Sequence, residues 1–237
     1  MPIQNYAVYT FLIAGMLLSI YFKKLTIPAA ITGGITGLLI YQGAGLTGIA
    51  MLTLFFILGS GATGWQIRSK QQIGAAEKDK GRRTAGQVIA NGGVAALIGA
   101  IIWRMPEAAV SHRIMMAGSL AAATADTLAS ELGTVYGKRF YNIITFKKDQ
   151  RGLDGVVSLE GTLIGIIGAA LIALVYSIGF GWGISFLWIM IGGAIGNLAD
   201  SVLGATLERK NLIGNNVVNF LNTLIGAVVC LLLWKMM

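Results

Sequence analysis

Five long stretches of this sequence contain no charged residue. They cover residues 1–22, 25–67, 84–103, 161–199 and 211–234. A helix needs about 20 predominantly apolar residues to cross the hydrocarbon core of a bilayer. Only 12% of the 237 residues are charged and 55% are hydrophobic, against roughly 25% and 45–50% in an ordinary soluble domain. The sequence therefore predicts an all-α, polytopic membrane helical bundle and excludes a soluble globule.

Two of the uncharged stretches are too long for one helix, and each contains closely spaced glycines. Glycine favours turns, so we expect breaks at residues 41–45 and 177–183. Residues 1–22 lack the basic segment and cleavage site of a signal peptide, so we expect them to remain as a first helix. The sequence predicts one integral membrane domain, 1–237, with about eight spans at residues 5–22, 27–41, 46–65, 86–103, 113–130, 157–176, 184–204 and 215–235.

The basic residues are distributed unevenly between the two sides of this bundle. Fifteen of the 18 lie in the loops 23–26, 66–85, 131–156 and 205–214, and only Arg104, Arg113 and Lys235 lie on the other side. The positive-inside rule predicts that the basic side is cytoplasmic and both termini are outside, as in a bacterial inner membrane. Because the net charge of +8 falls in these loops, we expect contacts with anionic lipid or a phosphorylated substrate and no nucleic acid.

A helix, loop and helix unit occurs twice in the second half of the chain. Residues 156–165 align with residues 217–226 and are identical at six of ten positions. An Ala-Asp pair precedes each segment, with Asp126 in the first copy and Asp200 in the second. Both copies start on the outer side, so they are parallel repeats, unlike the inverted repeats of many transporters. Chance similarity between apolar helices is the alternative, and the shared polar positions argue against it.

Asp126 lies inside the predicted fifth span, and Asp200 lies at the equivalent depth of the seventh. An ionised carboxylate there costs about 2.5–3.5 kcal/mol, so it is normally paired, metal-bound or facing water. Helix starts rich in amides and hydroxyls lie opposite, and their positive dipole ends favour anions. This combination suits a site for Mg²⁺ and phosphate. The alternatives are a structural helix contact for Asp126 and simple membrane topology for the basic loops.

Several segments, taken together and in order, resemble an integral membrane family that includes phytyl-phosphate kinase of plants and cyanobacteria and animal transmembrane protein 19. These segments are residues 77–83, 87–92, 125–133, 155–162, 200–206 and 218–221, within a resemblance that covers about residues 25–235. The Ala-Asp-x-x-Ala-Ser-x-x-Gly pattern at 125–133 is also similar to a motif of CTP-dependent polyprenol kinases and of CDP-diacylglycerol and CDP-archaeol synthases.

The resemblance implies phosphoryl transfer from a nucleoside triphosphate, CTP, to an isoprenyl monophosphate lipid such as phytyl or geranylgeranyl phosphate. It implies that the catalytic carboxylates of Asp126, Glu131 and Asp200 hold Mg²⁺. The residues expected to bind phosphate or nucleotide are Lys78, Arg82, Arg83, Asn91, Ser130, Ser158, Thr162 and Asn219. The alternatives are a CTP-dependent cytidylyltransferase acting on a lipid phosphate, a transporter of a small anion or metabolite, and a non-enzymatic scaffold. The almost wholly apolar outer halves of the later spans argue against a transport path.

Overall fold

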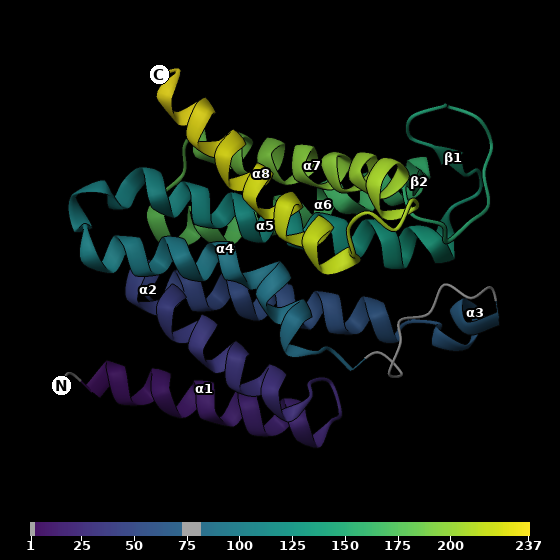
Figure 1. Ribbon diagram of the computed structural model, residues 1–237. Coiled ribbons are helices and arrows are strands. Elements are labelled where there is room, and N and C mark those ends of the chain that lie inside the picture. Colours follow the sequence, from purple (N-terminus) through teal and green to yellow (C-terminus); the bar gives the residue numbers. More distant parts are fainter. Residues whose placement is uncertain (1–2, 73–81) are drawn as a thin grey trace.

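The protein is almost entirely helical, and its computed structural model describes residues 3–72 and 82–237 (Figure 1). Two short strands, β1 (Tyr141–Asn142) and β2 (Val156–Val157), pair antiparallel in the connection between α5 and α6. The helices are α1 (Ile3–Tyr21), α2 (Ile27–Gly64), α3 (Ile67–Gln72), α4 (Ala85–Arg104), the 3₁₀ turn η2 (Pro106–Ala108), α5 (Ala109–Tyr136), α6 (Leu159–Phe180), α7 (Ser185–Leu203), the π-helical turn η3 (Gly204–Glu208) and α8 (Asn215–Lys235).

Helix α2 has 38 residues and bends sharply within its length. Gly45 has φ 59° and ψ −147° at the bend, a conformation that residues with a Cβ rarely adopt. Figure 1 shows the chain turning back there, so that α2 forms two arms. The arms correspond to the predicted spans at 27–41 and 46–65, and the predicted break between them is confirmed.

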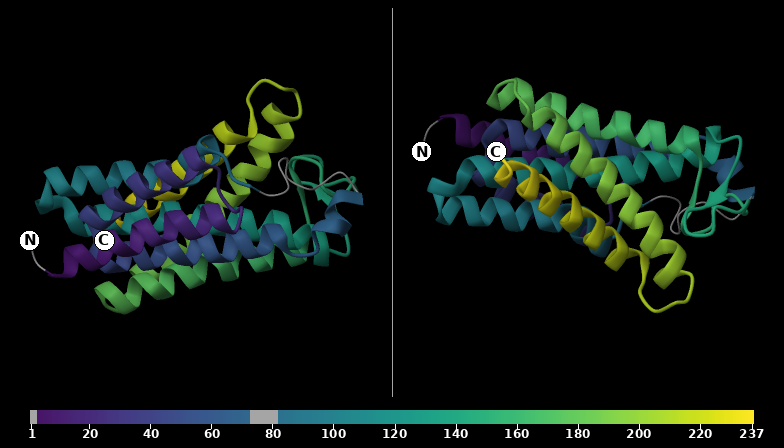
Figure 2. Two further views of the ribbon diagram at one scale, coloured as in Figure 1. Left: turned by 90° about the horizontal axis from the view of Figure 1, so that it is seen from below. Right: turned by 90° about the horizontal axis from the view of Figure 1, so that it is seen from above.

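The longer connections gather at one end of the bundle, whereas both termini and the short α4–α5 and α6–α7 connections lie at the other (Figures 1 and 2). We call the first the loop end; it contains the α1–α2 turn, α3, the connection 137–158 and the α7–α8 connection. We call the second the terminus end. Helices α5 and α7 run toward the loop end, whereas α6 and α8 return from it. This arrangement matches two copies of one unit used in the same orientation.

The long helices have the dimensions and surface of membrane spans. In the described part of the chain, α2, α4, α6, α7 with η3, and α8 are long and apolar enough to cross a bilayer. Helix α5 packs against α2, α4, α6, α7 and α8, and its middle is buried. Large apolar side chains such as Phe11, Leu97 and Ile167 are exposed on the outer helices, where a bilayer would cover them. The chain is an all-α, multi-pass integral membrane protein, as predicted.

Arg113 ties together three elements at the terminus end. Its Nε donates a hydrogen bond to the backbone oxygen of Gly43, with the two atoms 3.1 Å apart. Its guanidinium carbon lies 5.0 Å from the centroid of the Phe180 ring, within the range of a cation–π contact. The charge of Arg113 is therefore used to join α2, α5 and α6.

Candidate functional site

A cavity of about 820 Å³ lies among the helix ends at the loop end of the bundle. Every predicted site residue in the described part of the chain lines it, whereas Lys78 falls outside the described residues. The structure therefore collects residues from α4, α5, α6, α7 and α8 around one space. The predicted residues that line the cavity are Arg82, Arg83, Asn91, Asp126, Ser130, Glu131, Ser158, Thr162, Asp200 and Asn219.

Two carboxylates meet in the deep part of this cavity. Asp126 on α5 and Asp200 on α7 lie close enough for their side chains to interact directly. The Asn222 amide on α8 donates to Oδ2 of Asp200 over 3.4 Å. The two copies of the repeat therefore bring their aspartates together in one cavity.

Small residues let the helices that carry these carboxylates approach each other closely. A Cβ added at Gly226 on α8 would lie 2.7 Å from the backbone oxygen of Gly118 on α5. One added at Gly196 on α7 would lie 2.6 Å from the Cβ of Ala122 on α5. Both distances are too short for a real side chain, so glycine at these positions fixes the separation of α5, α7 and α8. Such small-residue contacts are usual between helices in membranes.

Glu131, the third predicted metal ligand, is engaged by a buried lysine. Nζ of Lys70 on α3 lies 2.5 Å from Oε2 of Glu131 and also donates to the backbone oxygens of Ala62 and Thr63, at 2.9 and 3.0 Å. The lysine is only 2% exposed, although the sequence places it in a basic loop. Among residues 3–72 and 82–237, no three His, Cys, Asp or Glu side chains are grouped closely enough to hold a metal ion. Of the three predicted metal ligands, Asp126 and Asp200 remain without a lysine partner in the described part of the chain.

Three helix N-termini border the same cavity. Thr84 and Gln87 form a capping box at the start of α4, and the Ser158 hydroxyl caps α6 by accepting a hydrogen bond from the Gly161 amide over 3.1 Å. Helix α8 starts after Gly214 without a side-chain cap. Because helix N-termini carry partial positive charge and free N–H groups, they favour bound anions. The predicted opposition of carboxylates and helix starts is therefore present.

The polar side chains around the cavity differ in how many of their hydrogen bonds are already made. Ser130 donates to the Asp126 backbone oxygen at 2.9 Å, and Thr162 donates to the Ser158 backbone oxygen at 3.0 Å. The Asn91 amide nitrogen donates to the backbone oxygen of Gln87 over 3.0 Å. Its Oδ1 is buried and has no hydrogen-bond partner in the described part of the chain. Among the predicted phosphate-binding residues, Asn91 therefore has a buried amide oxygen that could still accept a hydrogen bond.

The two adjacent arginines that precede α4 differ in exposure. Arg82 is exposed at the cavity. Arg83 is buried, and its guanidinium carbon lies 5.1 Å from the centroid of the Phe55 ring. The backbone of Arg83 also exchanges hydrogen bonds with Lys24 and Thr26 in the α1–α2 turn. Arg82 therefore has the freer guanidinium for a phosphate, whereas Arg83 also holds the loop against α2.

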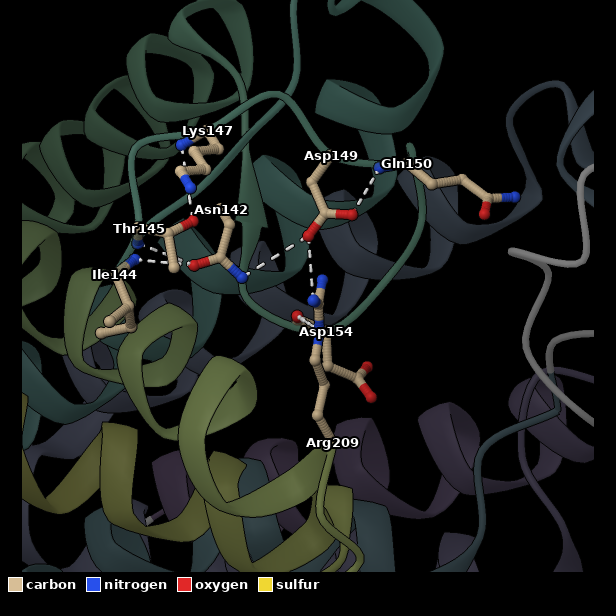
Figure 3. Close-up of polar contacts among 8 residues, drawn as sticks. All are labelled: Asn142, Ile144, Thr145, Lys147, Asp149, Gln150, Asp154 and Arg209. Atoms are coloured by element: carbon tan, nitrogen blue, oxygen red, sulfur yellow. Dashed lines mark hydrogen bonds and ion pairs between the residues drawn. The ribbon is translucent and has the colours of Figure 1, made fainter.

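The connection between α5 and α6 is folded over the end of α7 by polar contacts (Figure 3). Oδ1 of Asn142 accepts hydrogen bonds from the amides of Ile144 and Thr145, both at 3.0 Å. Nη1 of Arg209 lies 2.9 Å from Oδ2 of Asp149, and its Nε donates to the backbone oxygen of Asp154 over 2.6 Å. Arg209 thereby fixes the loop segment that brings Asp154 to the cavity.

Asp149 shows the electrostatic effect of these contacts outside the membrane. A hydrogen bond from the Gln150 amide, reinforced by the Arg209 guanidinium, lowers the pKa of the Asp149 carboxyl from its ordinary value. The carboxyl therefore stays ionised while the connection 137–158 is held in this conformation. Gly155 contributes to the same conformation, because it has φ +69° and packs directly against Ala205.

Several residues that line the cavity were not among the predicted site residues. Two are acidic: Asp154, in the α5–α6 connection, and Glu208, at the end of η3. They also include the amide side chains of Asn197, one turn before Asp200, and of Asn215 and Asn216 at the start of α8. The Gly-Asn-Asn sequence immediately before an apolar run was a usable signal for a helix start in the site. No sequence signal places Glu208 there, because its position depends on the π-helical turn.

Comparison with known proteins gives relatives along most of the chain. The chloroplastic protein VTE6 of Arabidopsis thaliana is 34% identical over 209 residues, which make up 83% of this chain and 61% of that protein. This chain thus spans about three fifths of the length of that relative. An uncharacterized membrane protein of Methanocaldococcus jannaschii is 34% identical over 205 residues, covering 86% of this chain and 83% of the relative.

A further relative is an uncharacterized membrane protein of Synechocystis sp., which is 34% identical over 206 residues, 83% of this chain and 78% of the relative. No solved structure is significantly similar to this chain. A family described as integral membrane protein DUF92 matches residues 10–227, which include every described residue of the predicted site. The chain therefore belongs to the DUF92 family of integral membrane proteins, and the family resemblance inferred from its motifs is confirmed.

Proposed function

We propose that this protein is a membrane-embedded isoprenyl-monophosphate kinase. It transfers a phosphoryl group from a nucleoside triphosphate, with CTP as the expected donor, to a lipid such as phytyl or geranylgeranyl monophosphate. The observation that carries this proposal is the cavity at the loop end, where the paired carboxylates of Asp126 and Asp200 and three helix N-termini border the same space. The membership of the family supports it.

The proposed reaction asks for positioning and charge neutralisation more than for covalent work by the protein. An oxygen of the lipid monophosphate attacks the γ-phosphorus of the nucleotide and forms a new P–O bond. The bond from that phosphorus to the β,γ-bridging oxygen breaks, and the electron pair leaves with the nucleoside diphosphate. Because the attacking oxygen is already ionised, the step requires no strong general base.

The residues present fit a magnesium ion bound together with phosphate. Asp126 and Asp200 lie side by side, and within the described residues neither carboxylate forms a salt bridge. Mg²⁺ is usually held by one or two carboxylates with phosphate oxygens and water in the remaining positions. Bound there, the ion would neutralise charge on the triphosphate. Asp126 and Asp200 would hold it, and Glu131 would act through its contact with Lys70.

The other cavity residues are assigned to the phosphates. The N-terminal amides of α4, α6 and α8 point their positive ends at the cavity, so they orient the anionic groups. Arg82 supplies an exposed guanidinium that lines the cavity, and Lys78 is predicted to bind phosphate with it. Ser130, Ser158, Thr162, Asn91 and Asn219 place hydroxyls and amides around the same space and orient the reacting groups.

The proposal places the loop end in the cytoplasm of a bacterial inner membrane, where nucleoside triphosphates are available, and both termini outside. All residues that line the cavity belong to the loop end. At the terminus end, Arg113 joins α2, α5 and α6. This arrangement supports a reaction served from one face and disfavours a transport path through the bundle.

One assay tests the proposal directly. Purified protein in detergent is incubated with Mg²⁺, CTP and geranylgeranyl monophosphate, and the products are identified by mass. We expect geranylgeranyl diphosphate and CDP, with no product when Mg²⁺ is chelated. A CDP-lipid together with pyrophosphate would assign the protein as a cytidylyltransferase instead. If no nucleotide supports turnover of a prenyl monophosphate, both enzymatic assignments are wrong.

A further inference from the structure

A second, smaller cavity of about 260 Å³ lies between the loop-end turns of α4 and α8. Asn216 and Val217 line both this cavity and the large polar one, so the two spaces adjoin at the start of α8. The lining side chains other than Asn216 are apolar or absent. We call this space the α4/α8 groove; its residues are Gly86, Ile89, Ala90, Asn216, Val217 and Phe220.

Small residues on α4 leave room for the groove, and α4 and α8 contact each other at both of its ends. Gly86 lies so close to α8 that an added Cβ would be 2.8 Å from Nδ2 of Asn216. One turn further along α4, Thr223 on α8 lies 3.4 Å from the backbone oxygen of Ala90, to which its Oγ1 donates. The groove therefore occupies about one helical turn between two points at which α4 and α8 touch.

The outer wall of the groove faces the region that a bilayer would occupy. Ile89 is 52% exposed, Val217 47% and Phe220 38%, although all three are large apolar residues on helices long enough to cross a membrane. In a membrane these side chains contact acyl chains and not water. The groove thus connects the bilayer on one side with the polar cavity on the other.

We propose that the α4/α8 groove holds the isoprenyl chain of the lipid monophosphate where the chain passes from the bilayer into the polar cavity. The inference rests on the proposed function, because that function supplies an amphiphile with one charged end. The change from apolar to polar lining across Asn216 and Val217 matches such a molecule. Its phosphate reaches the cavity of Asp126 and Asp200, next to the free N–H groups at the start of α8.

Photolabelling tests the location of the chain without depending on turnover. The probe is geranylgeranyl monophosphate with a diazirine on the isoprenoid chain, added to the purified protein in nanodiscs. We expect labelled peptides that contain residues 86–90 and 216–220, with labelling suppressed by unmodified geranylgeranyl monophosphate. Labelling confined to other helices overturns the inference. Equal suppression by an ordinary phospholipid overturns it too, because the groove would then hold bulk membrane lipid.

A matched pair of variants tests the role of the groove in substrate use. Val217→Trp adds bulk at its lip, whereas Val228→Trp places the same change on α8 eleven residues later, which is about three helical turns away on the same face. The exposures of the two valines are similar, at 47% and 40%. We expect Val217→Trp to raise KM for geranylgeranyl monophosphate about tenfold or more. Val228→Trp should behave as wild type.

The failure of this inference is distinguishable from failure of the proposed function. Labelling of the groove without lipid diphosphate formation retains the groove as a prenyl-phosphate site and removes the kinase. Lipid diphosphate formation with labelling elsewhere retains the kinase and removes the groove. Equal effects of Val217→Trp and Val228→Trp on KM also contradict the groove, because bulk on the lipid-facing surface would then explain both.

Discussion

Each copy of the repeated unit places an equivalent aspartate in the same cavity, but the two aspartates have different neighbours. Asp126 and Asp200 interact directly, so the copies converge on one site. At aligned positions on the returning helices, the first copy has Gly161 and the second has Asn222. A Cβ added at Gly161 would lie 2.9 Å from the backbone oxygen of Ala129, whereas Asn222 reaches across to Asp200. The aligned position therefore allows close helix packing in the first copy, whereas in the second copy its side chain donates a hydrogen bond to a carboxylate.

The connections within the two copies differ still more. Ser158 caps α6, but the aligned Asn219 lies inside α8, which starts at Asn215. Five residues after each aspartate, the first copy has Glu131, paired with Lys70, and the second has Ala205, against which Gly155 packs. The repeat therefore specifies the membrane-embedded helices and their carboxylates, whereas each loop has its own structure.

The largest expected effect tests whether both copies contribute a carboxylate. Asp126→Asn removes charge at the paired position and should lower kcat for lipid diphosphate formation by about 10²- to 10³-fold or more. Asp200→Asn should cause a comparable loss. Initial rates measure both, with size-exclusion profiles confirming that the variants stay folded. Wild-type activity in Asp126→Asn contradicts the metal assignment, and a much smaller effect of Asp200→Asn indicates that the second copy has a different role.

The next effect concerns the ion pair found in the first copy. Lys70→Met leaves the largely buried Glu131, whose side chain is 12% exposed, without its partner, which should destabilise the protein by about 3 kcal/mol. The double variant Lys70→Met with Glu131→Leu should recover much of that loss, because no charge is then buried. Denaturant unfolding in detergent measures both, with the exposed Lys210→Met as control. Equal free energies of unfolding for the single and double variants would show that the Lys70–Glu131 ion pair does not stabilise the protein.

A smaller effect is expected at the amide that distinguishes the second copy. Asn222→Ala removes the hydrogen bond to Asp200, so the carboxylate is less well oriented, and we expect activity to fall about 10- to 100-fold. The KM for Mg²⁺ should rise in the same variant. Ser177→Ala is the matched control, because Ser177 is a buried polar residue at the other end of the bundle. Unchanged Mg²⁺ dependence in Asn222→Ala shows that the amide does not support a metal ligand.

The smallest effect concerns the connection 137–158, which belongs to the first copy. The folded-state pKa of Asp149 is lowered from 3.8, so its contribution to holding the loop is complete above that value and is lost as the pH falls through the lowered pKa. The protection of residues 142–150 from hydrogen exchange, expressed relative to the intrinsic exchange rate at each pH, should fall over that range. In Asp149→Asn this protection should not depend on pH. Protection that does not change with pH in the wild type contradicts the proposed role of the Asp149–Arg209 contact.

The long apolar helices and the equivalent positions of the two aspartates could be predicted because they follow from local sequence. Uncharged runs set the helices, closely spaced glycines marked the bend at Gly45, and two Ala-Asp pairs occupied equivalent positions. The partners of these groups could not be predicted, because Lys70 reaches Glu131 across 61 positions and Asn222 reaches Asp200 across 22. Such contacts depend on helix separation, which side-chain packing determines.

The contacts of Arg113 with Gly43 and Phe180 join the helices at the end of the bundle opposite the cavity. The cavity therefore serves one end of the bundle, which bears on the leaflet into which the product of the proposed reaction is released. In the proposed reaction, the nucleotide, the lipid phosphate and the carboxylates all lie at the loop end, so substrate would enter and product would depart through a single leaflet. The added phosphate would make the lipid more anionic and raise the cost of crossing the hydrocarbon core. Under this proposal the head group of the lipid changes without a change of leaflet, so any enzyme that consumes the diphosphate would need its own site on that same leaflet.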